Sequence, residues 1–139
     1  MTVGLDLVRV QDVADAIARF GDRYLARVFT PAEIAYCTAA PGPLAAQRFA
    51  ARFAAKEAAR KVLRRGNAGL GWRDVEVCRA SDGAPALRLH GPAAQIAAAL
   101  GVYDLAVSIT HEAEWAAAVV TGTTTVVAPS PPRNEPRTG

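Results

Sequence analysis

The sequence predicts an α+β domain, because one long helical pattern is followed by two pairs of strand patterns. The helical pattern is the alanine-rich segment of residues 44–65, which ends at a glycine-containing segment. Residues 72–79 and 86–90 alternate around a Ser-Asp-Gly turn signal, and residues 105–110 and 115–121 alternate around a His-Glu-Ala-Glu segment. We expect each pair of strands to form an antiparallel hairpin.

The segment before the long helix begins with a strand and two helices. Residues 3–10 alternate and are rich in β-branched side chains, which predicts an opening strand with Asp6 in its middle. Aspartate is disfavoured inside a strand, so Asp6 is a candidate functional residue. Residues 11–20 carry apolar side chains at helical spacing, and Gly21 ends that pattern before a second short helix that reaches Val28.

A third helix is predicted from a recognisable start signal. Thr30 can cap the helix, Pro31 suits its first position, and Glu33 at the third position completes a capping box. We expect this helix to reach about Thr38. A further helix is predicted over residues 92–100, between the two hairpins.

Length and composition indicate one domain and exclude several classes of protein. The chain has 139 residues, of which 51% are hydrophobic, which is enough for one core. We expect the domain to span residues 1–122, followed by a flexible tail over residues 123–139 that has four prolines and no periodicity. No leader or membrane-spanning pattern is visible, and Cys37 and Cys78 lack the spacing of a disulfide framework or a zinc site. These features predict a cytoplasmic protein that does not enter a membrane.

Positive charge is concentrated in the first half of the chain. Residues 1–65 hold 11 Lys and Arg against 6 Asp and Glu, whereas the net charge of the whole chain is +3. This favours an acidic partner, which could be nucleic acid, a membrane surface, an acidic protein or a polyphosphate ligand. Five bases of the long helix also recur every four residues, a spacing at which like charges repel unless a polyanion lies along them. We call this set the basic ridge; it comprises Arg48, Arg52, Lys56, Arg60 and Arg64.

Two carboxylates stand in apolar surroundings. Glu57 continues a line of the long helix begun by Phe49 and Phe53, and Asp6 lies in a strand whose two faces are both apolar. A carboxylate near an apolar surface requires a cation, a metal or a proton. If the two side chains meet, they could share Mg²⁺ with phosphate oxygens and water. Otherwise Glu57 pairs with Lys61 one turn later, and Asp6 caps a turn or pairs with an arginine.

Two further features have both a functional and a structural interpretation. His111 ends an apolar strand face at a hairpin tip, where it either is structural or contacts phosphate or carries a proton. Arg19, Arg23 and Arg27 form a second basic stripe with aromatic neighbours. This stripe is either a solvated helix face or a docking surface for an acidic, partly apolar helix.

Six short blocks of the chain occur together in a characteristic order. They are GLDLV at residues 4–8, FT at 29–30 with Glu33, RFAAKEA at 52–58, WRDVE at 72–76, GAP at 83–85 and SITH at 108–111. In order and approximate spacing, the segment from residue 3 to about 121 resembles the holo-[acyl-carrier-protein] synthases, the short phosphopantetheinyl transferases. The resemblance implies a small antiparallel sheet packed around one long central helix, and a homotrimer that binds coenzyme A between subunits. The implied reaction moves 4′-phosphopantetheine from coenzyme A to a serine of an apo-acyl carrier protein and releases adenosine 3′,5′-bisphosphate.

The resemblance also assigns roles to the residues that match the family's motifs. Asp6 and Glu57 match the Mg²⁺ ligands, and Lys61 matches a lysine at the pyrophosphate of coenzyme A, so Glu57 and Lys61 are the catalytic candidates. The proton of the attacking serine would go to Glu57 directly or through a metal-bound water. The remaining matches are coenzyme contacts at Arg52, Gly83, Pro85, Thr110 and His111, and carrier-protein contacts at Arg23, Tyr24, Arg27 and Phe53.

The alternative interpretation is a small nucleic-acid-binding module that uses the basic ridge. It is disfavoured because aromatic residues make up only 6% of the chain, and because Glu57 would repel phosphate without a metal. The chain departs from the family's common pattern at Arg9, Asp12 and Glu112. Three acceptor classes fit the sequence, namely carrier proteins of fatty acid biosynthesis, of polyketide pathways and of peptide assembly lines, and acyl-coenzyme A is a possible donor.

Overall fold

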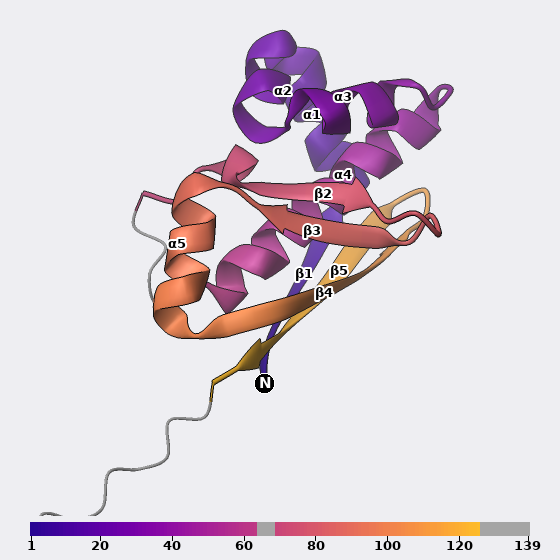
Figure 1. Cartoon of the computed structure of the whole chain (residues 1–139). Coiled ribbons are helices and arrows are strands. Elements are labelled where there is room, and N and C mark those ends of the chain that lie inside the picture. The colour runs from indigo at the N-terminus through magenta and orange to yellow at the C-terminus, as the bar shows by residue number, and fades with distance from the viewer. Residues whose placement is uncertain (64–68, 126–139) are drawn as a thin grey trace, which may run out of the picture.

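The computed structural model describes residues 1–63 and 69–125. Within these residues the chain forms five strands, five α-helices and one 3₁₀ helix, arranged as Figure 1 shows. In chain order they are β1 (Thr2–Arg9), α1 (Val10–Phe20), α2 (Asp22–Val28), α3 (Pro31–Thr38), α4 (Pro43–Val62), η2 (Trp72–Asp74), β2 (Val75–Arg79), β3 (Pro85–Leu89), α5 (Gly91–Leu100), β4 (Val102–His111) and β5 (Trp115–Thr124). The predicted α+β class is therefore confirmed.

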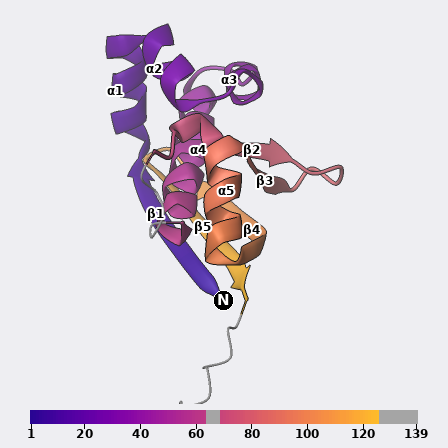
Figure 2. The same cartoon turned by 60° about the vertical axis from the view of Figure 1, so that its left-hand side comes forward.

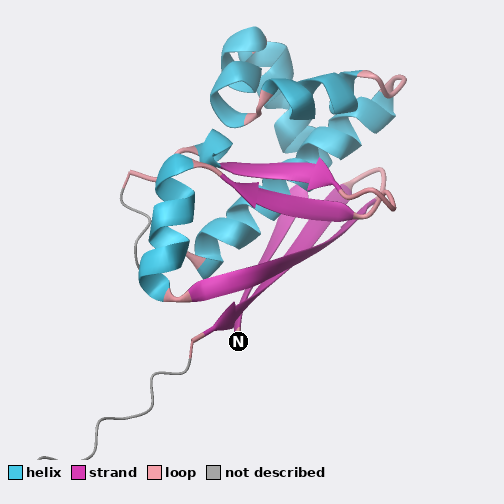
Figure 3. Ribbon diagram, in the orientation of Figure 1, coloured by secondary structure: helices cyan, strands magenta, loops and turns pink. Residues whose placement is uncertain are grey.

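The strands form two antiparallel sheets. A three-stranded sheet has the order β1-β5-β4, and a separate two-stranded sheet pairs β2 with β3. In the larger sheet Asp6 lies opposite Ala118, which in turn lies opposite Ile109. Both predicted hairpins are confirmed, and Figure 2 shows the β2–β3 hairpin projecting away from the larger sheet. Helices α1 to α3 lie together at one end of the molecule and the amino terminus lies at the other end, as Figure 3 shows.

Helix α4 lies at the centre of the packing and contacts β1, β5, α1 and α3. Its buried face consists largely of alanines, whose small side chains let the helix lie close to β1. A Cβ atom added to Gly4 would come within 2.0 Å of the carbonyl oxygen of Ala58, so only glycine fits at that point of the strand. The predicted packing of an antiparallel sheet around the long helix is confirmed.

The start of α3 has the geometry that the capping-box pattern predicts. Thr30 Oγ1 accepts a hydrogen bond from the backbone N–H of Glu33, and Glu33 Oε1 accepts one from the backbone N–H of Thr30. Pro31 occupies the first turn, where its missing N–H costs no hydrogen bond. Helix α5 ends at Gly101, which has a left-handed backbone conformation with φ 67°. Glycine in this conformation commonly caps the carboxyl end of a helix.

Strand β1 has one face toward α4 and one exposed face. Gly4 and Val8 are buried on the inner face, and Asp6 lies between them with 17% of its side chain exposed. On the outer face three large apolar side chains are more than 60% exposed; they are Val3, Leu5 and Leu7. Asp6 is therefore directed at the helix rather than at bulk water.

Several predicted boundaries differ from the structure. Residues 72–74 form a 3₁₀ turn rather than the start of a strand, because Asp74 Oδ2 accepts a hydrogen bond from the backbone of Gly71 at 2.7 Å and closes the turn. Strand β5 continues to Thr124, past its predicted end at residue 121, because its last threonines pair with β4. Residues 64–68 and 126–139 include the predicted end of the long helix and most of the predicted tail, and they lie outside the described residues.

Cys37 and Cys78 are both free thiols. Cys37 is fully buried, and burial raises the pKa of its thiol to about 11, so it behaves as a small apolar side chain. Cys78 is only partly buried. Among residues 1–63 and 69–125, no helix is both long enough and apolar enough to cross a bilayer.

Candidate functional site

Asp6 of β1 and Glu57 of α4 line the same cavity, which has a volume of about 440 Å³. Apolar side chains of β1 and α1 form part of its wall, and the rings of Tyr24 and Phe53 form another part. The strand and the helix meet here because Gly4 and Ala58 allow close packing a short distance away. The structure therefore brings together the two carboxylates that were predicted to share a metal.

The two carboxylates disfavour each other's charge in this position. Burial raises the pKa of Glu57 above its usual value, and the negative charge of Asp6 raises it further. Arg60 and Lys61 act in the opposite direction, but the net shift is upward. A cation bound between the two carboxylates would oppose both causes of the shift.

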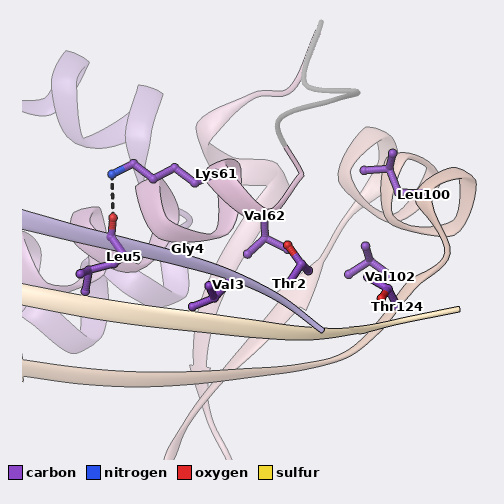
Figure 4. A pocket seen from close by; sticks show the side chains of 9 residues that line it. All are labelled: Thr2, Val3, Gly4, Leu5, Lys61, Val62, Leu100, Val102 and Thr124. Atoms are coloured by element: carbon purple, nitrogen blue, oxygen red, sulfur yellow. Dashed lines mark hydrogen bonds between the residues drawn. The ribbon is translucent and has the colours of Figure 1, made fainter. Parts of the chain in front are cut away.

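Lys61 lies on the Asp6 side of this pair. Its Nζ donates to Asp6 Oδ1 at 3.1 Å and to the carbonyl oxygen of Leu5 at 2.6 Å, and Figure 4 shows the second bond. In the described part of the chain Lys61 forms its ion pair with Asp6, so the alternative Glu57–Lys61 pair is wrong. Half of the Lys61 side chain is exposed, and it also lines a neighbouring cavity of about 530 Å³ between β1, the end of α4 and α5.

Asp6 and Glu57 fit a magnesium site. Carboxylate oxygens are the protein ligands that Mg²⁺ prefers, and Mg²⁺ commonly takes one or two of them while phosphate and water complete its shell. No group of three or more His, Cys, Asp and Glu side chains is arranged to hold a metal in residues 1–63 and 69–125. Asp6 and Glu57 would supply two ligands, and the observation that supports such a site is that strand and helix bring both carboxylates to one cavity.

A second cavity, of about 160 Å³, brings together most of the predicted coenzyme contacts. It is lined by Tyr36, Arg52, Arg79, Gly83, Pro85 and His111, among others. Arg52 is only 7% exposed, and its Nε has no hydrogen-bond partner among the described residues. His111 Nδ1 lies 3.0 Å from Gln47 Oε1, which holds the imidazole at the rim. A buried guanidinium nitrogen without a partner favours an anionic ligand in this cavity.

Tyr36 and Arg79 belong to this cavity but were not predicted. Three guanidinium groups lie near the ring of Tyr36, with carbon-to-centroid distances of 4.4 Å for Arg48, 4.1 Å for Arg52 and 5.1 Å for Arg79. Arg79 also donates a hydrogen bond to the hydroxyl of Tyr36. These residues come from α3, α4 and β2, and no sequence spacing links them.

Thr110 lines neither of these cavities. Side chains alternate along a strand, so Ile109 and His111 face the second cavity while Thr110 faces the opposite side of the sheet. There it lies opposite Ala117, which in turn lies opposite Leu7. Thr110 therefore belongs to the exposed outer face of the larger sheet.

The predicted carrier-docking residues fall in two adjoining places. Arg23, Tyr24 and Arg27 line an open cavity of about 450 Å³ together with Phe20, on the surface of α1 and α2. Phe53 lies on α4 and instead lines the cavity of Asp6 and Glu57, which we call the carboxylate cavity. Tyr24 lines both cavities, so the basic surface of α2 borders the carboxylates.

The interpretation of the basic ridge as a surface for a polyanion is wrong. Arg52 and Lys56 are buried, with 7% and 0% exposure, and so they cannot present a continuous charged surface. The bases instead have partners within the protein: Lys56 pairs with Glu33 at 2.7 Å, Arg48 and Arg52 share the ring of Tyr36, and Arg60 lies on Trp72. Arg64 lies outside the described residues. The nucleic-acid-binding alternative therefore loses the surface on which it rested.

A family model described as the 4′-phosphopantetheinyl transferase superfamily matches residues 2–120. The chain belongs to this superfamily. The match runs from β1 into β5, so it includes the residues that line the carboxylate cavity. It also includes those that line the second cavity, which we call the Arg52 cavity. As a phosphopantetheinyl transferase the chain is an enzyme, which confirms the class predicted from its motifs.

Curated relatives and solved structures agree with this assignment. The holo-[acyl-carrier-protein] synthase of Koribacter versatilis is 48% identical over 118 residues, which are 84% of this chain and 93% of the relative. That of Moorella thermoacetica is 44% identical over 121 residues, which are 86% of this chain and 91% of the relative. The Helicobacter pylori holo-[acyl-carrier-protein] synthase in complex with coenzyme A matches with a TM-score of 0.75 at 28% identity, covering 88% of this chain and 100% of that one. The ACPS–CoA complex of Chronobacterium ammoniagenes has a TM-score of 0.76 at 29% identity, covering 90% and 98%.

Sequence reasoning missed a buried polar network in this phosphopantetheinyl transferase. Thr30 Oγ1 donates to Glu76 Oε2 at 2.6 Å, and Glu76 Oε1 lies 3.1 Å from His90 Nε2. The hydrogen bond from Thr30 is the main cause that lowers the pKa of Glu76. The capping-box pattern identified Thr30 and Glu33, but it carries no information about partners on β2 or at the start of α5.

Proposed function

We propose that the chain transfers the 4′-phosphopantetheine group of coenzyme A to a serine hydroxyl of an apo-acyl carrier protein and releases adenosine 3′,5′-bisphosphate. The observation that carries this proposal is the shared cavity of Asp6 and Glu57, with Lys61 bonded to Asp6 and the ring of Tyr24 leading to a basic surface. The names of the relatives, and the coenzyme A bound in two of the similar structures, support the same reaction.

The chain's own side chains supply the chemistry around the diphosphate. The serine oxygen attacks the β-phosphorus, and the bond from that phosphorus to the bridging oxygen of the diphosphate breaks. Glu57 is placed to accept the serine proton, because its carboxylate lines the cavity that the serine would enter. Lys61 stabilises the negative charge that develops on the departing phosphate. Asp6 and Glu57 would hold Mg²⁺, which when bound offsets part of the diphosphate charge.

The adenosine end of coenzyme A would occupy the Arg52 cavity. Arg52 and His111 are suited to the 3′-phosphate, because one has an unpartnered buried nitrogen and the other stands at the rim. Gly83 and Pro85 form a wall of the same cavity and would lie against the adenine. Arg79 and Tyr36 would add a further guanidinium and a ring surface for this end of the ligand.

The carrier protein would dock on the α1–α2 surface. Arg23 and Arg27 offer positive charge to an acidic helix, while Tyr24 and the exposed Phe20 offer apolar contact. Since Tyr24 also lines the carboxylate cavity, a serine at the start of the docked helix could enter beside Phe53 and Glu57. The identity of the acceptor and the cytoplasmic location stay predictions.

Mass spectrometry of apo-carrier proteins incubated with coenzyme A and Mg²⁺ tests the proposed function. We expect the mass of the carrier to increase by one phosphopantetheine group, on serine, and the gain to disappear when a chelator replaces Mg²⁺. A panel with carriers of fatty acid, polyketide and peptide pathways identifies the acceptor class. No transfer to any member of the panel would contradict the proposal, and salt-sensitive RNA binding in its place would favour the nucleic-acid alternative.

We also propose that the chain assembles as a homotrimer through the outer face of the larger sheet. Val3, Leu5 and Leu7 make this face apolar, and contiguous exposed apolar side chains of this kind favour a protein interface. Thr110 lies on the same face, so it would approach coenzyme A bound by a neighbouring subunit rather than by its own. Analytical ultracentrifugation should give three times the chain mass of 14.6 kDa, and Leu5→Glu should lower it. A wild-type monomer would contradict this assembly.

A further inference from the structure

Lys56, which precedes Glu57 on α4, is completely buried and fully hydrogen-bonded. Its Nζ lies 2.7 Å from Glu33 Oε1, and neither side chain of this ion pair is exposed. The same nitrogen donates to the carbonyl oxygen of Val75 at 2.6 Å and to that of Trp72 at 3.1 Å. One ammonium group therefore joins α4 to α3, to η2 and to the start of β2.

Glu33, the partner of Lys56, is equally constrained. Besides Lys56, Oε1 accepts a hydrogen bond from the backbone N–H of Thr30 at 2.8 Å, and Oε2 accepts one from the backbone N–H of Val77 at 2.9 Å. Thr30 in turn donates to Glu76. The ion pair thus lies in a network of directional bonds whose other ends are backbone atoms of α3 and β2.

Apart from this ion pair, α4 packs through a few large side chains and many small ones: Phe49 lies against Phe29, and Phe53 stacks on Trp72. The fully buried positions are mostly alanines: Ala50, Ala51, Ala54, Ala55, Ala58 and Ala59. Methyl groups at these positions pack closely but do not interlock as large side chains do, so they resist rotation of the helix less than large side chains would. Buried ion pairs contribute little net stability, and their best-attested use is to select one register among several.

We propose that Lys56 is a positioning residue, which sets the rotation of α4 about its axis so that Glu57 faces Asp6. The inference rests on the proposed function, in which Asp6 and Glu57 act together. Consecutive helical residues point about 100° apart, so bonds that hold Lys56 against α3 and β2 direct Glu57 toward β1. On that side Gly4 lies against Ala58, and Lys61 donates to the carbonyl oxygen of Leu5, so both faces of the helix are anchored.

The test compares wild type with Lys56→Met and with the double variant Lys56→Met/Glu33→Gln. The single change leaves the Glu33 carboxylate buried without its cation and is expected to destabilise the fold. The double variant removes both charges, and glutamine retains an acceptor for the capping box. All assays are run well below the measured unfolding midpoint of each protein. In the double variant we expect kcat to fall about 100-fold, the loss typical of a misplaced catalytic group, while KM for coenzyme A changes less than threefold.

Arg88→Met is the matched control, because Arg88 lies on the exposed rim of the same network, 3.9 Å from Glu76. It should leave kcat unchanged. Crystal structures of wild type and the double variant decide the question without substrate: we expect α4 to be turned and the separation of the Asp6 and Glu57 carboxylates to change. A folded double variant with wild-type kcat and unchanged carboxylates would overturn the inference. Absence of transfer by the wild type would count against the proposed function, while the two crystal structures would still test the role of Lys56.

Discussion

Replacing Glu57 with glutamine is expected to lower kcat for phosphopantetheine transfer by roughly 10²- to 10⁴-fold, the usual contribution of a catalytic acid or base. Glutamine has almost the same shape, so the cavity and the packing of α4 should be retained. The amide can neither accept the serine proton nor give Mg²⁺ an anionic oxygen. Steady-state kinetics with the acceptor identified by mass spectrometry measures the loss, and circular dichroism measures the fold.

The same substitution is expected to stabilise the protein against unfolding at neutral pH without divalent ions. The pKa of Glu57 is raised in the folded state, so the folded chain retains this proton to higher pH than the unfolded chain. As pH rises through the folded-state pKa, Glu57 ionises beside Asp6 and the wild type loses stability. Thermal unfolding should therefore show a higher Tm for Glu57→Gln at neutral pH and a smaller difference in acid.

Asp104→Asn serves as the control for Glu57→Gln, because it removes one carboxylate from an exposed position of β4, away from the α1–α2 surface, and asparagine tolerates the positive φ found there. Turnover of this control should equal that of the wild type. Near-normal turnover of Glu57→Gln would remove the catalytic role that we assign to the carboxylate cavity, whatever its effect on Tm.

Arg27→Glu is expected to raise KM for the carrier protein roughly tenfold or more, because it replaces attraction with repulsion on the surface that an acidic helix would approach. Arg27 is exposed on α2 and lines the open cavity rather than the carboxylate cavity, so KM for coenzyme A should not change. The difference between wild type and variant should shrink as salt increases, because exposed charges are screened. Initial rates at varied carrier concentration and ionic strength measure both effects.

Arg88→Glu reverses an exposed charge on β3 and is the control for Arg27→Glu. We expect it to leave KM for the carrier unchanged. If Arg27→Glu also leaves that KM unchanged, the carrier docks elsewhere and the α1–α2 surface is not its binding site.

Features that depend on neighbouring residues could be predicted from the sequence. The capping box of Thr30 and Glu33 formed as expected, because both partners lie within one turn of the same helix. The two hairpins formed for the same reason, since short turns bring consecutive strands together. The proximity of Asp6 and Glu57 was predictable only through the family resemblance, because their elements are distant in sequence.

Features that depend on distant partners could not be predicted from local pattern. The basic ridge looked exposed because lysine and arginine are rarely buried, yet Lys56 finds Glu33 on another helix and Arg52 lies against Tyr36. One alternative paired Lys61 with Glu57 at the next turn of the helix, but β1 offers Lys61 both Asp6 and a backbone carbonyl. In each case the helical spacing placed the bases correctly along α4. Their burial and their partners depend on other helices and strands, which helical spacing does not describe.

The close approach of Gly4 to the backbone of Ala58 would also limit the kind of ion that the proposed site can hold. A magnesium ion binds oxygen at about 2.0–2.1 Å, so its two protein ligands must converge from strand and helix within a narrow span. A side chain at Gly4 would collide with the backbone of Ala58, move the helix outward and widen that span, and a larger, more tolerant ion such as calcium would then fit better. In the proposed site, the distance between strand and helix would thus select the ion by its radius, through residues outside the metal's coordination shell.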